Sequence, residues 1–404
     1  MHKVPILLIF LGHMFIDASQ GILPVVVAKQ KELFDLSYFQ VGLMMMVLNL
    51  TSSVIQPVFG YISDRFRSSW FIPVGILWTA AAMGLLGWSP SYVFAVLLVG
   101  LAGLGTAAFH PRAMMTVFLL SGEKKGLGTA VFSMGGNLGF AIGPIIGGFL
   151  VLGFGLHATL GLLPPCLLIF LLIVFYPGDA LRREAVTVTE TETKTETETE
   201  SSEEKTTSAE PENSIPWGSL TAVCLIVTLR SWVYVSFITF LPLFFQGKGI
   251  ELKTGSLILT VFLASGALAG LYGGHLSDRF GRKRIIVYSS LLYPLITALM
   301  ISVKGPWLWL LAGASGAALL ASFSVTIVLA QELMPRYLGL ASGLILGLSF
   351  GTGGLGSALS GFLADNYGLG QTFWLLTTIP VLAAFLTYFI KVPESSAAIQ
   401  PAGA

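Results

Sequence analysis

The ionisable side chains inside the long apolar runs of this sequence are the first candidates for chemistry. Asp17 is the only acid well inside any of these runs, and His13 lies four residues before it. On a helix this spacing is one turn, or about 6 Å of rise, and Gln20 falls on the same face. Neighbouring aspartate and histidine groups can gain and lose protons as one coupled unit. His13 and Asp17 are therefore predicted to carry out proton coupling, with Gln20 beside them in the substrate site.

A cation stands at the matching place in the second half of the chain. Arg230 follows Asp17 by 213 residues (230 − 17), the offset at which Gly147-Gly-Phe recurs as Ser360-Gly-Phe in an internal repeat. We expect the two to lie at equivalent depths and to face each other across a cavity, with Tyr234 one turn further on the Arg230 face. Because arginine stays protonated, an anionic substrate that binds Arg230 would release Asp17 to accept a proton. The alternative is a buried ion pair that only fixes the two halves together.

Two further runs contribute polar groups to the predicted substrate site. His110 and Arg112 are two residues apart and cannot share a helix face, so we assign Arg112 to the cavity as a second cation. For His110, packing beside Pro111 and carrying a proton are both open. Ser133 and Asn137, one turn apart, either line the site or hydrogen-bond to a neighbouring helix.

The elements that hold these residues are predicted to be membrane helices. Hydrophobic residues make up 54% of the 404 residues and charged residues only 11%, against about 25% charged in soluble domains. A helix needs about 20 mostly apolar residues to cross a bilayer. The sequence thus predicts an all-α polytopic membrane protein with twelve transmembrane helices, at roughly 4–27, 38–62, 70–88, 91–119, 126–152, 157–176, 216–245, 253–276, 284–302, 306–331, 338–363 and 370–390.

The distribution of lysine and arginine predicts the orientation. Thirteen of these residues fall in one set of loops and five in the other, which places both termini in the cytoplasm. Residues 184–213 carry ten Glu, two Lys and no aromatic residue, a composition typical of disorder, either as a tether or as a regulatory acidic segment. The predicted domains are an N-terminal six-helix bundle at 1–180, a disordered Thr/Glu-rich cytoplasmic linker at 181–214, a C-terminal six-helix bundle at 215–392 and a cytoplasmic tail at 393–404.

Two loop motifs show that the halves repeat each other. Gly60-Tyr-Ile-Ser-Asp-Arg-Phe recurs 214 residues later as Gly274-His-Leu-Ser-Asp-Arg-Phe. The doubled motif resembles the loop motif of the major facilitator superfamily. The resemblance implies two pseudo-symmetric six-helix bundles with a substrate site near the midplane between them, and a cluster that latches the cytoplasmic side. The gating residues so implied are Gly60, Asp64, Arg65, Gly274, Asp278, Arg279 and Arg282; the glycines allow close helix approach, and the two aspartates can cap the next helix.

Further segments resemble particular branches of that superfamily. Gly139-x-x-x-Gly-Pro-x-x-Gly-Gly148 resembles the motif of its antiporter members, although close helix packing alone would also explain it. His13-x-x-x-Asp17, Phe109-His-Pro followed by Gly135-Gly-Asn, and Leu229-Arg-Ser-Trp together resemble the fosmidomycin resistance family of proton-driven exporters. Arg112 stands where an acidic residue is common in that family.

These features predict a secondary active transporter, a proton-coupled antiporter that exports small organic compounds, anionic or antimicrobial ones among them, by alternating access. The alternative is a proton symporter or facilitator that imports a metabolite such as an organic acid. An enzyme is not expected, because His13, His110 and His275 fall in separate spans. We expect no metal and no cofactor, with the proton gradient as the energy source, and no nucleic-acid partner, since there is no extended basic patch. A monomer in the bacterial cytoplasmic (inner) membrane is the predicted setting.

Overall fold

The protein is an all-helical bundle with the predicted number of spans. The computed structural model describes residues 3–66, 68, 70–175, 215–335 and 337–391. In these residues twelve helical segments are long and apolar enough to cross a membrane, and no strand occurs. The predicted linker and C-terminal tail lie outside the described residues.

Six spans belong to the first half of the chain. They are built from α1 (Lys3–Gly21) and α2 (Leu23–Phe34), α3 (Tyr38–Asn49) and α4 (Gln56–Phe66), α5 (Phe71–Leu85), α6 (Tyr92–Leu120), α7 (Lys125–Gly147), and α8 (Leu163–Phe175). Short 3₁₀-helical or π-helical segments extend or join some of them: η1 (Leu50–Val54), η2 (Leu86–Trp88), η3 (Gly122–Lys124), η4 (Gly148–Leu152) and η5 (Leu156–Leu162).

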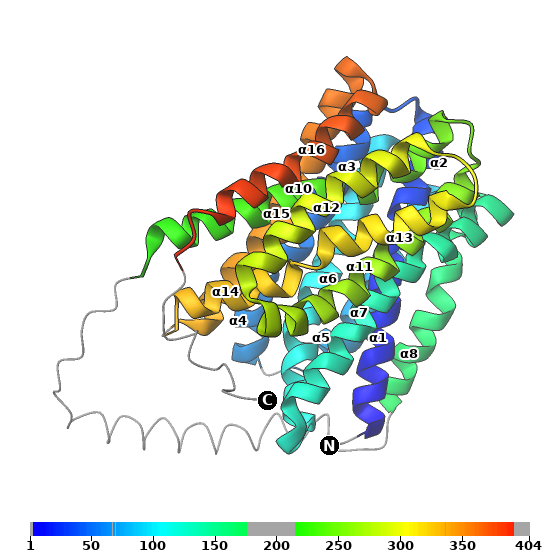
Figure 1. The fold of residues 1–404 in the computed structure, drawn as a ribbon. Coiled ribbons are helices and arrows are strands. Elements are labelled where there is room, and N and C mark those ends of the chain that lie inside the picture. Colours follow the sequence, from blue (N-terminus) through cyan, green and yellow to red (C-terminus); the bar gives the residue numbers. More distant parts are fainter. Residues whose placement is uncertain (1–2, 67, 69, 176–214, 336, 392–404) are drawn as a thin grey trace, which may run out of the picture.

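The second half repeats this arrangement. Its spans are α10 (Trp217–Gly247), α11 (Leu252–Phe280), α12 (Arg282–Ser302), α13 (Trp307–Leu320) with α14 (Phe323–Leu333), α15 (Leu338–Tyr367) and α16 (Leu369–Thr387). In Figure 1, α1, α5 and α8 lie on one side of the molecule and α12, α14 and α16 on the other.

The first span is longer than its predicted end at residue 27. Its helix is interrupted only at Ile22 and continues as α2 to Phe34. Pro24 stands in the first turn of α2, where its missing N–H leaves no hydrogen bond unmade. Ser37 then starts α3 through a capping box with Gln40, in which each side chain bonds the other residue's backbone N–H.

The glycine-rich face of α7 packs against α1. A Cβ atom added to Gly143 would lie 2.5 Å from the Cα of Gly21, and one added to Gly139 would lie 2.8 Å from the carbonyl carbon of Met14. Both distances are too short for non-bonded carbon atoms, so the two backbones touch because these side chains are missing. Close packing of α1 and α7 therefore accounts for the motif that begins at Gly139.

The two halves of the protein meet along a close seam between α3 and α15. A Cβ atom at Gly42 would lie 2.9 Å from the Cα of Ala358, and one at Gly361 would lie 2.8 Å from the Cα of Phe39. At the Tyr38 end of this seam, the Asp365 carboxylate accepts hydrogen bonds from the backbone N–H groups of Tyr38 (2.7 Å) and Phe39 (2.8 Å). An acidic residue of one half thus caps the first turn of a helix in the other.

Beside this cap, Gln246 donates to Glu32 over 2.7 Å, again between the halves. These contacts define the closed end of the molecule, by which we mean the end that holds Glu32 and Asp365. Asp365 lies beyond residue 363, the predicted end of this span, but still within the last turns of α15.

Candidate functional site

A cavity lies between the two halves and is lined by both. The volume of this cavity is about 200 Å³. Its apolar wall includes Phe140, Ile238 and Phe350. Its hydrogen-bonding wall is formed by Asp17, Gln20, Asn49, Ser52, Ser53, Gln56, Thr106, His110, Asn137 and Tyr234.

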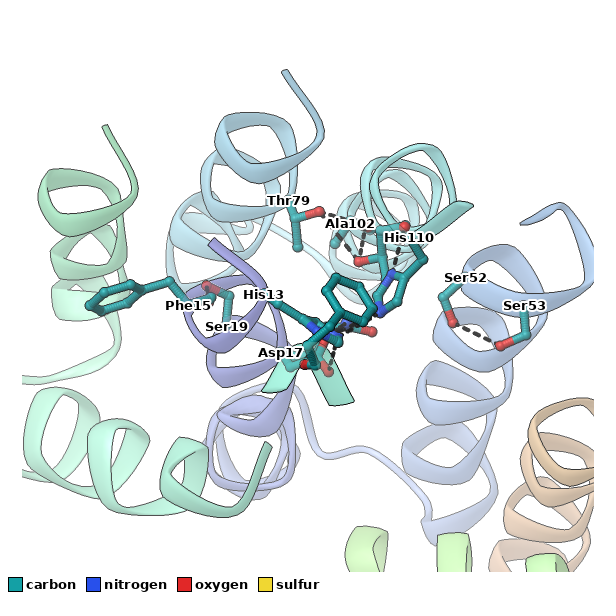
Figure 2. A network of polar contacts seen from close by, with 12 residues as sticks. His13, Phe15, Asp17, Ser19, Ser52, Ser53, Thr79, Ala102 and His110 are labelled. Carbon is teal, nitrogen blue, oxygen red and sulfur yellow. Dashed lines mark hydrogen bonds and ion pairs between the residues drawn. The ribbon is translucent and has the colours of Figure 1, made fainter. Parts of the chain in front are cut away.

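A cluster of two histidines and one aspartate forms part of this wall (Figure 2). His13 Nε2 lies 3.3 Å from Asp17 Oδ2, and Gln20 donates to Asp17 Oδ1 over 3.2 Å, so the predicted stripe on the first helix exists. His110 arrives from α6: its Nε2 lies 3.1 Å from His13 Nε2 and 3.8 Å from Asp17 Oδ1. The structure thus brings His110, whose role the sequence left open, into direct contact with the predicted proton-coupling pair.

The backbone fixes which nitrogen of each ring carries a proton. His13 Nδ1 lies 2.8 Å from the carbonyl oxygen of Phe132, and His110 Nδ1 lies 2.9 Å from that of Thr106. A carbonyl oxygen only accepts hydrogen bonds, so both Nδ1 atoms are donors. In their neutral forms both rings would therefore present a bare Nε2 nitrogen, and these two nitrogens face each other.

One side of the cluster packs against aromatic rings, and the other side borders the cavity. His13 is 5% exposed and stacks on Phe132 with ring centroids 4.0 Å apart, with Phe109 on another side at 5.7 Å. The side chains of Asp17 and His110 are 16% and 22% exposed and border the cavity. A group that enters the cavity meets Asp17 and His110 first, and His13 lies behind them.

Gly136 on α7 makes room for this cluster. A Cβ atom there would lie 2.7 Å from Asp17 Oδ2 and closer still to the His13 ring. Gly136→Ala is therefore expected to push His13 and Asp17 apart and to reduce proton-driven transport at least about tenfold, since even a small displacement breaks a hydrogen bond. Transport by reconstituted variant protein measures the effect. Gly153→Ala is the matched control, because no atom of the described residues lies within 4 Å of a Cβ atom there. Full activity of Gly136→Ala would contradict the assignment of the cluster.

The predicted pair between Asp17 and Arg230 is not formed. Arg230 is buried inside the second half, where Nη1 donates to the carbonyl oxygen of Ser322 and to Thr326 Oγ1, each over 3.1 Å. It does not border the central cavity, whereas Tyr234, one turn further along α10, does. The repeat offset gives equal depth in the two halves but does not fix the direction in which a long side chain extends.

Two other predicted cavity residues lie elsewhere. Arg112, which we had assigned to the cavity, is 6% exposed, contacts Met115 and is not among the residues that line the cavity, whereas His110 is. Ser133 does not border the cavity, and Asn137 does. Without Arg112 and Arg230, no lysine or arginine stands among the described residues that line the cavity.

The second span contributes polar residues to the cavity that were not predicted from the sequence. Asn49, Ser52, Ser53 and Gln56 lie on α3, η1 and the start of α4 and border the cavity opposite the cluster. The signal was available: these polar residues interrupt an apolar run at spacings of three and four, which puts Asn49, Ser52, Ser53 and Gln56 on one side of a helix.

The gating motifs lie on helix ends rather than in loops. Gly60 and Arg65 belong to α4, and Gly274, Asp278 and Arg279 to α11. The side chain of Asp64 lies outside the described residues. A Cβ atom at Gly274 would lie 3.1 Å from Ser324 Oγ on α14, while one at Gly60 would make ordinary contacts with Pro111 on α6.

Asp278 was expected to cap the following helix, but it does not. α12 begins after Gly281, whose φ of 91° favours glycine, and no side chain in the described part of the structure caps it. Asp278 instead pairs with Arg282, which also donates to Glu332 Oε1 over 3.2 Å. The Arg282 cluster thus ties together α11, α12 and α14, all within the second half.

Loss of the Arg282 cluster is expected to slow transport without weakening substrate binding. Arg282→Ala removes both carboxylate contacts far from the cavity, so it should change how readily the second half rearranges. We expect turnover to fall about threefold to tenfold, with substrate affinity unchanged within about twofold, in paired transport and binding assays. A large loss of affinity at normal turnover would place this cluster in contact with substrate instead.

Spacing alone leaves two assignments for the cluster of His13, Asp17 and His110. Their ligand atoms lie within 4.8 Å of one another, which would also admit a metal ion. The 3.1 Å between the two Nε2 atoms is also a normal N–H···N hydrogen-bond length, so the same spacing admits a shared proton.

The fold and the cavity define the class of the protein. Two six-helix halves around a central polar cavity are the architecture of a membrane transporter that works on small molecules. Residues 9–256 and 224–404 match the family model of the Major Facilitator Superfamily, and the chain belongs to this superfamily. Its family and fold are those of transporters and not of enzymes.

Relatives support this assignment over nearly the whole chain. The chain is 32% identical over 396 residues to the uncharacterised MFS-type transporter YfnC of Bacillus subtilis (strain 168), covering 95% of this chain and 92% of the relative. It is 27% identical over 387 residues to the fosmidomycin resistance protein of Escherichia coli (strain K12), covering 95% and 91%. The predicted resemblance to the fosmidomycin resistance family is confirmed.

Solved structures show the same fold. An inward-facing, occupied bacterial homologue of the human lysosomal transporter Spinster matches with a TM-score of 0.76 at 15% identity, covering 98% of both chains. A D-xylose–proton symporter matches with a TM-score of 0.74 at 16% identity, covering 98% of this chain and 99% of the other.

Proposed function

We propose that this transporter is a proton-coupled antiporter that exports small organic compounds by alternating access. The observation that carries the proposal is the contact between the Nε2 atoms of His13 and His110 beside Asp17. Both rings donate from Nδ1 to backbone carbonyls, so a hydrogen bond between the Nε2 atoms requires one additional proton. The resulting imidazolium is balanced by the Asp17 carboxylate.

The cluster has two states with different electrostatics. With the proton bound, one positive ring faces one carboxylate, and the cluster is neutral. After the proton leaves, two lone pairs oppose each other, and Asp17 keeps a negative charge at the cavity wall. The groups that face Asp17 from the surrounding elements are His13 and Gln20 on α1, His110 on α6, Gly136 on α7, which offers no side chain, and Tyr234 on α10 across the cavity.

Competition for Asp17 gives the exchange of proton and substrate. A substrate that donates a hydrogen bond or carries positive charge binds best to the deprotonated cluster, and a returning proton displaces it. Exchange follows because one carboxylate serves both partners, each of which stabilises a different state. This differs from the predicted switch, in which an anion on Arg230 would have released Asp17.

The lining of the cavity indicates the class of substrate. Amides and hydroxyls on one side and Phe140, Ile238 and Phe350 on the other suit a compound with both polar and apolar parts. The one acid and the lack of lysine and arginine among the described lining residues favour an uncharged or basic compound over an anion. Export is supported by the names of relatives, the fosmidomycin resistance protein and the multidrug resistance protein MdtG of Salmonella typhi, which is 30% identical over 184 residues.

We place the protein in the bacterial inner membrane as a monomer with both termini in the cytoplasm, following the loop charges. In that orientation the closed end at Glu32 and Asp365 faces outward. An exporter loads its substrate from the cytoplasm, which is the side opposite this closed end.

Transport by purified protein in liposomes with an imposed pH gradient tests the proposal. Phosphonates, basic aromatic drugs and organic acids would be screened, with a chelator present so that bound metal plays no part. Substrate movement opposite to the proton flow, with dissipation of the gradient, is the expected result. Substrate uptake together with protons would contradict antiport and favour the symport alternative.

A further inference from the structure

Arg230 is a buried cation whose described partners are all neutral. Its side chain is 4% exposed. Nη1 donates to the carbonyl oxygen of Ser322 and to Thr326 Oγ1, and the guanidinium carbon lies 5.1 Å from the centre of the Phe323 ring. Nη2 has no hydrogen-bond partner among the described residues. None of these groups neutralises the charge.

The acids of the described part of the second half are committed elsewhere or remote. Asp278 and Glu332 pair with Arg282, and Asp365 caps α3. Glu251 immediately precedes α11, beyond the C-terminal end of α10, whereas Arg230 lies near the middle of α10. Asp17 of the first half contacts His13, His110 and Gln20 instead.

A small cavity lies beside Arg230, separate from the central one. It is enclosed by α10, α12, α16 and the break between α13 and α14, and it is lined in part by Ser289, Ser290, Tyr293 and Ser322. The space open to the centre of a water-sized sphere is about 10 Å³, roughly the room that one water molecule or one small ion needs. A transported organic compound would not fit.

Charge and space together indicate what this cavity holds. A guanidinium does not lose its proton in a protein, and an uncompensated charge inside a membrane protein costs several kcal/mol. The charge can be balanced by an anion that accepts from Nη2 and from nearby hydroxyl groups. The ion has to be monovalent to match one arginine and monatomic to fit the space.

We propose that Arg230, with the hydroxyl-bearing residues Ser290 and Tyr293, forms a buried binding site for one small halide of the chloride class. The site lies within the second half and is independent of the proposed proton coupling. A bound halide links α10 and α12 and thereby stabilises the bundle. It is a structural ion and not the transported substrate.

Thermal unfolding of the purified, full-length protein tests the site. Chloride would be compared with gluconate, which is too large for the cavity, at constant ionic strength. We expect a saturable rise of about 3 °C or more in chloride, because a ligand that binds only the folded state stabilises it. Arg230→Gln should abolish the chloride dependence. Lys304→Gln, at an exposed loop position, should retain it.

Two results would overturn the proposal: a wild-type melting temperature independent of chloride, or an Arg230→Gln variant that responds as the wild type does. If Arg230→Gln does not fold, crystals of the wild type grown in bromide decide the matter. An anomalous peak within hydrogen-bond distance of Arg230 Nη2 supports the site. The lack of such a peak contradicts it.

Discussion

Asp17→Asn is expected to reduce proton-driven transport to the rate of protein-free liposomes, while exchange of labelled for unlabelled substrate remains measurable. Asparagine keeps the shape of the side chain and can still hydrogen-bond with Gln20. It cannot balance the charge of an imidazolium, so the contact between His13 and His110 loses the carboxylate that stabilises its additional proton. Asp17→Asn should therefore lose proton coupling while the cavity still binds substrate.

Parallel assays on one preparation separate the two effects. Gradient-driven transport and substrate exchange would be measured for Asp17→Asn and for Gln56→Ala, a cavity variant that removes a polar group but no proton site. Gln56→Ala should lower affinity at most and keep the response to the pH gradient. If Asp17→Asn transports with the pH dependence of the wild type, the proton is carried elsewhere.

The second large effect is expected at the closed end. Asp365→Ala removes both hydrogen bonds to the backbone of Tyr38 and Phe39, which join the halves. A hydrogen bond to a charged group contributes about 1.5–3 kcal/mol, and we take the lower end for the two bonds together because Asp365 is exposed. Loss of about 1.5 kcal/mol shifts the ratio between closed and open forms of this end about tenfold, since 1.4 kcal/mol corresponds to a factor of ten.

Distances between spin labels at positions 33 and 367 report this opening. Leu33 and Tyr367 are exposed and belong to different halves, close to the seam between α3 and α15. Asp365→Ala should move the distribution towards longer distances. Asn366→Ala is the control, because among the described residues that side chain donates to the carbonyl oxygen of Phe362 in its own helix and does not join the halves. An unchanged distribution in Asp365→Ala would show that the cap does not hold this end closed.

Local spacing predicted the parts of the site that lie on one helix. His13, Asp17 and Gln20 are three and four residues apart, so helix geometry alone places them on one face. The twelve spans followed from the length of the apolar runs in the same way. The glycines of α7 indicated a close helix contact, although not that α1 would be the partner.

Contacts between distant segments could not be predicted this way. His110 reaches His13 across 97 residues, and Asp365 reaches Tyr38 across 327. For Arg230 the repeat fixed the depth, but the break between α13 and α14 brings the carbonyl of Ser322 within reach of the guanidinium. No pattern in the sequence around residues 320–323 indicated that break.

The additional proton between His13 and His110 is the central feature of the proposed coupling. Nitrogen-15 NMR of histidine-labelled protein in liposomes tests it directly, because the chain has only five histidines and His110→Gln assigns the pair. We expect a coupling between the two Nε2 nitrogens across a hydrogen bond at low pH, which disappears as the pH is raised and is lost in Asp17→Asn. Two Nε2 nitrogens that titrate independently, with no coupling at any pH, would contradict it.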